Sequence, residues 1–562
     1  MRAASALSQD DVAIRFQAWL DDECKRHPVF ATQQGKRDFD GQMDDLSPAA
    51  RAEDTQRDAA VLAELTTRLD RSKLSRASQI DLEIWQHYLR YRIWQASNVD
   101  EFANDPRVYI SFCSDSVFGL FTQSTLPRHR NVENAVSRIA KIPSVIAAAK
   151  SSLRNPPRIL TEVAIKRADG AISFYERDIF ALAEESPQIS SLAESCRKAA
   201  IALKDYKTFL ETEVLPRSNG QWRLGLEKFS EKLSLELDAG LTAKEVIDTA
   251  DAEAERVERE MYYVAKQLWS SVLGSRTLPP DDVAGRRETI QAVLAELGKN
   301  HGTAESLVQD TRQTVDRIKS FIREKRILTL PEPDQCSIIE MPEFQRGFSA
   351  AYLNQAPPLD AKAKSLYAIS PPPSDWPADR QRAFFQEYNS SMLQVLTIHE
   401  AYPGHYVQLD YANRIDSLVR KVLSSGVFAE GWAVYTEQMM LDEGYGEGDL
   451  SLRLHQLKFY MRAVLNAILD YRMHCSNMSD EEAFALLVDR GFQTSGEADG
   501  KIQRAKQSSC QLSTYFVGRT AFYRLRQSVQ RARGEGFQLG KFHEEVLLQG
   551  TLPVKYLTEL VK

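Results

Sequence analysis

Apolar residues recur at the spacing of α-helices along most of the chain. Val61, Leu65 and Leu69 follow this spacing, and so do the apolar residues from Ile80 to Leu89. The spacing places apolar side chains on one face of a helix, where they can pack against neighbouring helices. Glycine and proline, which interrupt helices, account for only 26 and 22 of the 562 residues. The sequence therefore predicts a mainly α-helical protein.

Proline becomes frequent in one stretch, from Leu328 to Pro377, which carries nine of these residues. Two short runs within it, Cys336 to Met341 and Lys364 to Ser370, are rich in apolar and β-branched residues and are separated by turn-forming residues. Such runs are typical of strands. We therefore predict one small β-sheet in an otherwise helical chain.

The same change in composition sets the predicted domain boundaries. Residues 1–327 are expected to form a helical N-terminal lobe, residues 328–377 a Pro-rich segment with short strands, and residues 378–562 a helical region. Gly220 and Gly225 are expected to mark only a turn between two helical layers of the first lobe. The predicted fold is thus mainly α and two-lobed.

The charge balance excludes two classes of partner. Lys and Arg number 71 and Asp and Glu 78, which gives a net charge of −7. A mildly acidic chain is a poor match for the phosphate backbone of nucleic acids or for an anionic membrane surface. No apolar run approaches the roughly 18 residues that a membrane helix needs. We expect neither nucleic acid nor a membrane as a partner, and the sequence leaves the oligomeric state open.

The N-terminal residues and the cysteines both favour a cytoplasmic location. Gln9, Asp10 and Asp11 lie where a signal peptide would place its apolar core. The six cysteines are widely spaced and form no Cys-x-x-Cys pair, so the sequence indicates neither a disulfide framework nor a thiolate zinc site. Buried thiols in a cytoplasmic protein are the simplest interpretation.

Two of the nine histidines, His399 and His405, lie six residues apart, and Glu400 follows the first. Two imidazoles with an adjacent glutamate are typical of zinc hydrolases, in which the imidazoles bind the metal and the carboxylate serves as general base. On an unbroken helix, six residues separate two side chains by about 120°. Both histidines can therefore reach one metal only if the helix is broken between them.

Pro403 and Gly404 supply a candidate break. Proline cannot donate the backbone hydrogen bond that continues a helix, and glycine adopts backbone angles that other residues resist. The alternative is that Pro403 and Gly404 simply end one helix and that His405 begins an ordinary turn.

A hydrolytic zinc site typically has three protein ligands, and Glu430 is the candidate for the third. It lies in the apolar run from Val427 to Val434, where an unpaired buried carboxylate would be strongly unfavourable unless a cation accompanied it. Glu437 lies seven residues further on and faces the same side of the predicted helix. It is either a group that supports a metal ligand or a surface glutamate.

These motifs resemble those of a known family. His-Glu-Ala-Tyr-Pro-Gly-His at 399–405 and Glu-Gly-Trp-Ala at 430–433 are similar to motifs of the large bacterial family called domain of unknown function 885. The resemblance extends over about 16–560. It implies a mostly helical zinc-dependent peptidase related to the thermolysin-like class, with the zinc ligands His399, His405 and Glu430 and the general base Glu400.

A second block, Arg462 to His474, also resembles the family, although Arg472 stands where the family usually has glycine. His474 could donate a hydrogen bond to a developing oxyanion, with Asp470 fixing its tautomer. The alternative is a core histidine whose hydrogen bonds are satisfied within the fold.

A third block, Arg504 to Gly518, matches the family at Gln511, Tyr515 and Gly518, while Ser509 and Cys510 replace its Pro-Gly pair. Tyr515 is the best phenol for stabilising an oxyanion, and Arg504 is the best cation for holding a substrate carboxylate. A structural hydrogen bond is the alternative for each of them.

One further substrate contact is predicted near the strands. The run from Ser365 to Ser370 could pair with an extended peptide as an added strand, with Tyr367 lining a cleft. The alternative is a short structural edge strand.

We therefore expect a zinc-dependent hydrolase that cleaves a peptide or amide bond, with the small sheet beside the metal-binding helices and the helical N-terminal lobe closing one side of a cleft. Two other functions remain open at this point. One is a metal-dependent hydrolase of a small non-peptide amide or ester, and the other is a non-catalytic helical protein that binds a ligand.

Overall fold

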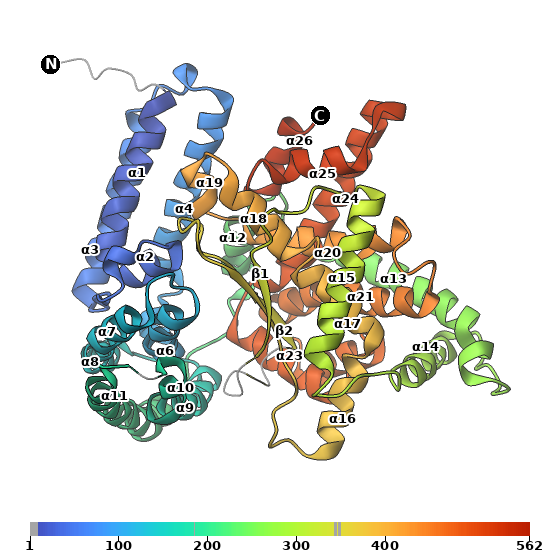
Figure 1. Cartoon of the computed structure of the whole chain (residues 1–562), viewed down its shortest axis with the longest axis horizontal. Coiled ribbons are helices and arrows are strands. Elements are labelled where there is room, and N and C mark those ends of the chain that lie inside the picture. The colour runs from blue at the N-terminus through green and yellow to red at the C-terminus, as the bar shows by residue number, and fades with distance from the viewer. Residues whose placement is uncertain (1–8, 185, 342–345, 347–349) are drawn as a thin grey trace. The chain divides into compact units, whose positions relative to one another are not determined.

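The computed structural model describes residues 9–184, 186–341, 346 and 350–562, and most of them lie in helices (Figure 1). The predicted mainly α fold is confirmed. Among the described helices, none combines the length and the apolar character needed to cross a bilayer. The chain divides into two compact units.

The first unit contains the described residues up to Trp222 and two later segments, Ala356–Lys364 and Asp416–Leu423. Its helices are α1 (Gln9–Arg26), α2 (Pro28–Gln34), α3 (Pro48–Thr67), α4 (Arg76–Asn98), α5 (Glu101–Asn104), α6 (Arg107–Thr122), α7 (Arg128–Ile139), α8 (Ile142–Ser152), α9 (Arg158–Ser173), α10 (Ile179–Ala183), α11 (Ile189–Phe209) and α19 (Leu418–Val422).

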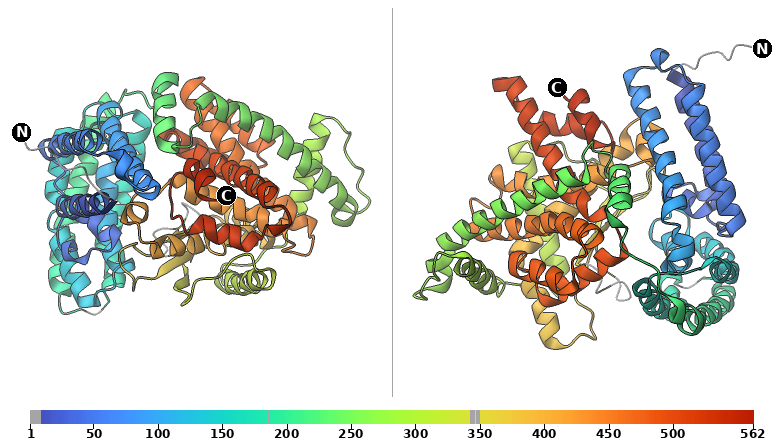
Figure 2. Two further views of the ribbon diagram at one scale, coloured as in Figure 1. Left: turned by 90° about the horizontal axis from the view of Figure 1, so that it is seen from above. Right: turned by 180° about the vertical axis from the view of Figure 1, so that it is seen from behind.

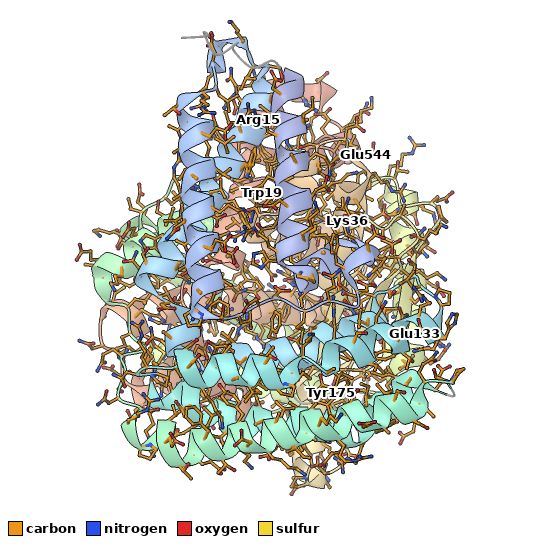
Figure 3. The ribbon with its side chains drawn as sticks, turned by 90° about the vertical axis from the view of Figure 1, so that its left-hand side faces the viewer. Arg15, Trp19, Lys36, Glu133, Tyr175 and Glu544 are labelled. Carbon is orange, nitrogen blue, oxygen red and sulfur yellow. The ribbon has the colours of Figure 1, made fainter. Side chains whose placement is uncertain are left out.

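Aromatic side chains hold the long helices of this unit together. The ring of Trp85 on α4 lies 5.2 Å from that of Phe16 and 5.7 Å from that of Trp19, both on α1. Figure 3 shows Trp19 among these helices, with the later helices, in cyan and green, running across them. The two later segments join by ion pairs, Arg37 with Asp360 at 3.0 Å and Arg420 with Asp81 at 2.6 Å.

The second unit contains Arg223–Gln355, Ser365–Ile415 and Ser424–Lys562. Its helices are α12 (Gly225–Leu237), α13 (Ala243–Leu273), α14 (Val283–Leu297), α15 (Leu307–Lys325), α16 (Ala378–Glu387), α17 (Ser390–Glu400), α18 (His405–Arg414), α20 (Gly426–Asp442), α21 (Leu450–Cys475), α22 (Asp480–Ala485), α23 (Ser495–Gln507), α24 (Thr514–Arg533), α25 (Leu539–Leu547) and α26 (Leu557–Leu560).

The boundary between the units lies at Trp222, not at residue 327 as predicted. Helices α12 to α15 belong to the same unit as His399, His405 and Glu430, because α13 packs along α21, a pairing that both views of Figure 2 show in green and orange. The break around Gly220 and Gly225 is therefore the point where one unit ends and the other begins. Most of the Pro-rich stretch belongs to the second unit, but residues 356–364 within it belong to the first.

The predicted sheet is present and has three strands, β1 (Cys336–Glu340), β2 (Ala351–Asn354) and β3 (Ser365–Ile369), in the order β1-β3-β2. Strand β3 pairs in parallel with β1 and antiparallel with β2. The sheet lies against α15 and α17 (Figure 1). It is therefore beside the helix that carries His399, as expected.

Candidate metal centre

The helix containing His399 ends where the sequence predicted. Helix α17 stops at Glu400 and α18 starts at His405, with four residues between them. A Cβ atom at Gly404 would lie 1.9 Å from the carbonyl oxygen of His399, so no larger residue fits this turn. The indole nitrogen of Trp432 donates to the carbonyl oxygen of Pro403 at 2.8 Å and fastens the turn to α20. The predicted break is confirmed.

The break brings the three predicted ligands together. The Nε2 atoms of His399 and His405 lie 3.7 and 3.5 Å from Oε2 of Glu430, and one ligand atom from each residue lies within 4.8 Å of the others. Oε2 of Glu430 is buried and has no hydrogen-bond partner among the described residues. Ligand bonds of about 2.1 Å in a tetrahedral zinc site separate ligand atoms by about 3.4 Å. The observed arrangement fits a single zinc ion.

Glu437 supports the first of these ligands. It is fully buried, and its Oε1 lies 2.7 Å from Nδ1 of His399. A carboxylate beside Nδ1 favours the imidazole tautomer that carries its proton on Nδ1 and donates it to Glu437. The lone pair of Nε2 is then free on the side that faces Glu430. Of the two interpretations of Glu437, the structure agrees with the supporting group and excludes the surface residue.

The electrostatics of the metal-free centre follow from these contacts. Burial lowers the pKa of His399, but its interactions with Glu430 and Glu437 outweigh this effect and raise the pKa well above its usual value. Burial raises the pKa of Glu430, but the two imidazoles outweigh it and hold that pKa well below the usual range. The centre therefore keeps a carboxylate charge that suits a cation.

Glu400 lies beside the ligands without being one of them. Burial raises its pKa, while the imidazoles of His399 and His405 and a hydrogen bond from the backbone of Leu353 on β2 counteract part of this effect. A carboxylate with a raised pKa close to a water-activating centre can accept a proton and later return it. This placement suits the predicted general base.

Tyr515 and Arg504 are brought to the same centre by α24 and α23. Helix α24 packs closely on α20, which carries Glu430. The Tyr515 hydroxyl accepts long hydrogen bonds of 3.4 Å from Arg504 and from Gln511. Burial raises the pKa of Tyr515, and the nearby Glu430 carboxylate adds to this effect. The phenol is therefore protonated at neutral pH and able to donate a hydrogen bond.

His474 does not match its predicted catalytic role. Its Nε2 faces the carbonyl oxygens of Ala505 and Ser508 at 3.1 and 3.0 Å, and its Nδ1 faces the backbone N–H of Leu224 at 3.4 Å. Burial lowers its pKa to about 4. Both ring nitrogens are engaged by backbone, so His474 corresponds to the alternative, a core histidine.

Tyr367 also differs from its prediction. It lies on the central strand β3, whose two sides are occupied by β1 and β2, so no peptide can add to this strand. The side chain is fully buried, and its hydroxyl lies 3.2 Å from that of Thr397 on α17. Tyr367 therefore joins the sheet to the helix of His399. The alternative of an edge strand is wrong as well.

Two residues near the centre were missed from sequence. The ring of Phe459 on α21 lies 5.8 Å from that of His399 in an edge-on arrangement. Lys501 on α23 is close enough for the charge of Glu430 to act on it. Each belongs to an ordinary helical pattern, so neither carries a motif that could have identified it.

Comparisons with known proteins agree with this fold. The model of the family described as "Bacterial protein of unknown function (DUF885)" matches residues 28–561. No curated protein shows a significant match. Two solved structures, each described as that of a "putative lipoprotein", are similar to this chain. The cytoplasmic location stays a prediction.

The first of these structures, from Shewanella oneidensis, has 28% sequence identity and a TM-score of 0.82, and the match covers 99% of this chain and 100% of that chain. The second, from Colwellia psychrerythraea, has 17% identity and a TM-score of 0.80 over 99% of each chain, which shows the fold alone. Since the family model spans nearly the whole sequence, the chain belongs to the DUF885 family of bacterial proteins.

Proposed function

We propose that this protein is a zinc-dependent hydrolase that cleaves peptide or amide bonds. One observation carries the proposal. Two imidazole nitrogens converge on a buried carboxylate oxygen that has no hydrogen-bond partner among the described residues, with Glu400 directly beside them. The two nitrogens lie too far from this oxygen for good hydrogen bonds, but at the spacing of ligands around one cation. His399, His405 and Glu430 would hold that cation.

Bound zinc would supply Lewis acidity, which lowers the pKa of a water molecule and polarises a carbonyl group. The residues of the chain would perform the remaining steps. Glu400 accepts a proton from the attacking water as the new carbon–oxygen bond forms. It then passes this proton to the leaving amine nitrogen as the carbon–nitrogen bond breaks. The bond is thus hydrolysed without any further reactant.

Tyr515 would stabilise the negative charge that develops on the oxygen of the scissile carbonyl. Its pKa is raised, so the hydroxyl keeps its proton and can donate a hydrogen bond. Glu437 would act only through His399, whose ring it orients through the bond of 2.7 Å to Nδ1.

The proposal is tested by metal analysis together with turnover of a random peptide mixture. The purified wild type is expected to contain one zinc ion per chain and to cleave peptides, and Glu400→Gln is expected to retain zinc and lose turnover. If the wild type binds no zinc, the hydrolase is rejected in favour of a ligand-binding protein. If zinc is bound and only small amides or esters are cleaved, the peptide substrate is wrong. If Glu400→Gln is fully active, the assigned base is wrong.

A further inference from the structure

The three cations on α23 have different partners. Lys506 pairs with Asp480, with Nζ and Oδ2 2.5 Å apart. Lys501 and Arg504 have no carboxylate within 4.0 Å among the described residues. Arg504 donates instead to two neutral groups, the amide oxygen of Gln511 at 2.8 Å and the hydroxyl of Tyr515 at 3.4 Å. No carboxylate among the described residues therefore pairs with the positive charge of the Arg504 guanidinium.

The acidic groups around Lys501 are already engaged. Glu497 lies one helical turn before it but accepts hydrogen bonds from Arg462 at 3.1 Å and from Tyr388 at 3.2 Å. Glu430, the other carboxylate that acts on Lys501, belongs to the metal centre.

The neighbouring carboxylate Glu387 pairs with Lys458 at 2.7 Å. The two carboxylates Glu387 and Glu497 are thus engaged by Lys458 and Arg462. Lys501 and Arg504 are therefore left without an ion-pair partner among the described residues.

Lys501 and Arg504 lie next to the candidate metal centre. The charge of Glu430 acts on both Lys501 and Tyr515, and Arg504 contacts the Tyr515 hydroxyl directly. Burial and the charges of Arg462 and Arg504 lower the pKa of Lys501 well below its usual value. An anionic ligand would favour the ammonium form of Lys501 and would pair with the exposed guanidinium of Arg504.

We propose that Lys501 and Arg504 bind a carboxylate of the substrate beside the metal centre, so that the enzyme cleaves peptides near a free C-terminus. This inference rests on the proposed hydrolase function. A guanidinium matches a carboxylate with two parallel hydrogen bonds, and an ammonium adds a compact charge. Hydrolysis then releases a short C-terminal fragment, as the leaving amine takes its proton from Glu400.

The test uses three N-acetylated hexapeptide mixtures with the zinc-loaded full chain. The first mixture ends in free carboxylates and lacks Asp and Glu. The second is identical but ends in amides, and the third consists of amides with one internal Glu. The free acids are expected to be cleaved at least about tenfold faster than the amides. Equal rates for acids and amides overturn the proposal. Faster cleavage of the third mixture than of the other two also overturns it, and would show that Lys501 and Arg504 bind an acidic side chain of the substrate instead.

Variants then assign the effect to the two residues. Lys501→Met and Arg504→Gln are each expected to raise KM for the free acids by about 10- to 100-fold, and so to remove most of the preference for acids over amides. Lys506→Met is the matched control, because it removes the same charge from the same helix but from a residue paired with Asp480. An equal effect of Lys501→Met and Lys506→Met contradicts the proposed site.

A binding measurement separates this proposal from the hydrolase itself. Calorimetry with Glu400→Gln measures binding of the free-acid and amide mixtures without any cleavage. Tighter binding of the acids, lost in Lys501→Met/Glu400→Gln, supports the carboxylate site even if the wild type cleaves nothing. Equal binding of acids and amides refutes the site even if the wild type is an active hydrolase.

Discussion

The backbones of Gly431 on α20 and Gly518 on α24 touch. A Cβ atom on Gly431 would lie 2.4 Å from the Cα of Gly518, and one on Gly518 would lie 2.1 Å from the carbonyl oxygen of Val427. Gly431 follows Glu430, and Gly518 lies one turn after Tyr515. The crossing of the two helices thus places the proposed oxyanion donor beside Glu430, a proposed metal ligand.

Gly518→Ala is expected to force α20 and α24 apart, because backbone atoms occupy the position of the new Cβ atom. The expected loss of stability is about 1–3 kcal/mol or more, measured by urea denaturation, together with a loss of zinc affinity. Gly496→Ala on α23 is the control, since a Cβ atom there meets no atom within 4 Å. If Gly518→Ala and Gly496→Ala are equally stable, the close contact is not real.

Glu437→Gln is expected to weaken zinc binding by about 10- to 100-fold, because an amide orients the His399 ring less firmly than a carboxylate does. Competition with a fluorescent chelator measures this change. Asp442→Asn removes a charge near the end of the same helix and should leave the affinity unchanged. Zinc affinity equal to that of the wild type in Glu437→Gln would show that the contact of 2.7 Å does not support the metal.

Tyr515→Phe is expected to lower kcat by about 10²- to 10³-fold with little change in KM, since the phenol is proposed to stabilise charge that appears only in the transition state. Steady-state kinetics on the peptide mixture measure both constants. Zinc content must stay at the wild-type value for this interpretation to apply. A rise in KM at constant kcat would instead make Tyr515 a binding residue.

His455→Gln is expected to make the stability of the protein less dependent on pH. Burial lowers the pKa of His455 to about 4, against an unfolded value of 6.5. Between these two values only the unfolded chain binds the proton, so stability is present above pH 6.5 and is lost as the pH falls toward 4.

This single proton contributes about 1.4 kcal/mol per pH unit to the slope of unfolding free energy against pH. Urea denaturation of the zinc-free protein at a series of pH values measures that slope for the wild type and for His455→Gln. Glutamine can keep hydrogen bonds to Asn389 and to the backbone of Ser451, which the imidazole makes at 2.9 and 2.7 Å. Identical slopes for the two proteins would show that His455 titrates normally in the fold.

The helices and the candidate metal ligands were predictable because they depend on residues close together in sequence. Helical spacing of apolar residues predicted the fold class, and Pro403 with Gly404 predicted the break that separates α17 from α18. The position of Glu430 in an apolar run predicted a buried carboxylate. Backbone hydrogen bonding and burial decide each of these features over one or two helical turns.

The domain boundary was not predictable in the same way. The Pro-rich stretch was the obvious candidate for the boundary between the units, but the first unit ends at Trp222. The reason is that α13 packs on α21, which lies about two hundred residues later in the chain. Such a pairing depends on which apolar faces fit each other, and helical spacing in a single sequence does not specify the partner of a face.

The sequence by itself determined a mainly helical chain, its small sheet and the residues His399, His405 and Glu430. Only the tertiary structure decided what surrounds them. It buried Glu437 against His399, placed Tyr367 on a central strand, and turned His474 toward backbone carbonyls. It also left Lys501 and Arg504 without acidic partners among the described residues. The physical reason is that hydrogen bonds and charge pairs act over a few ångströms, between residues that only the packing of distant helices brings together.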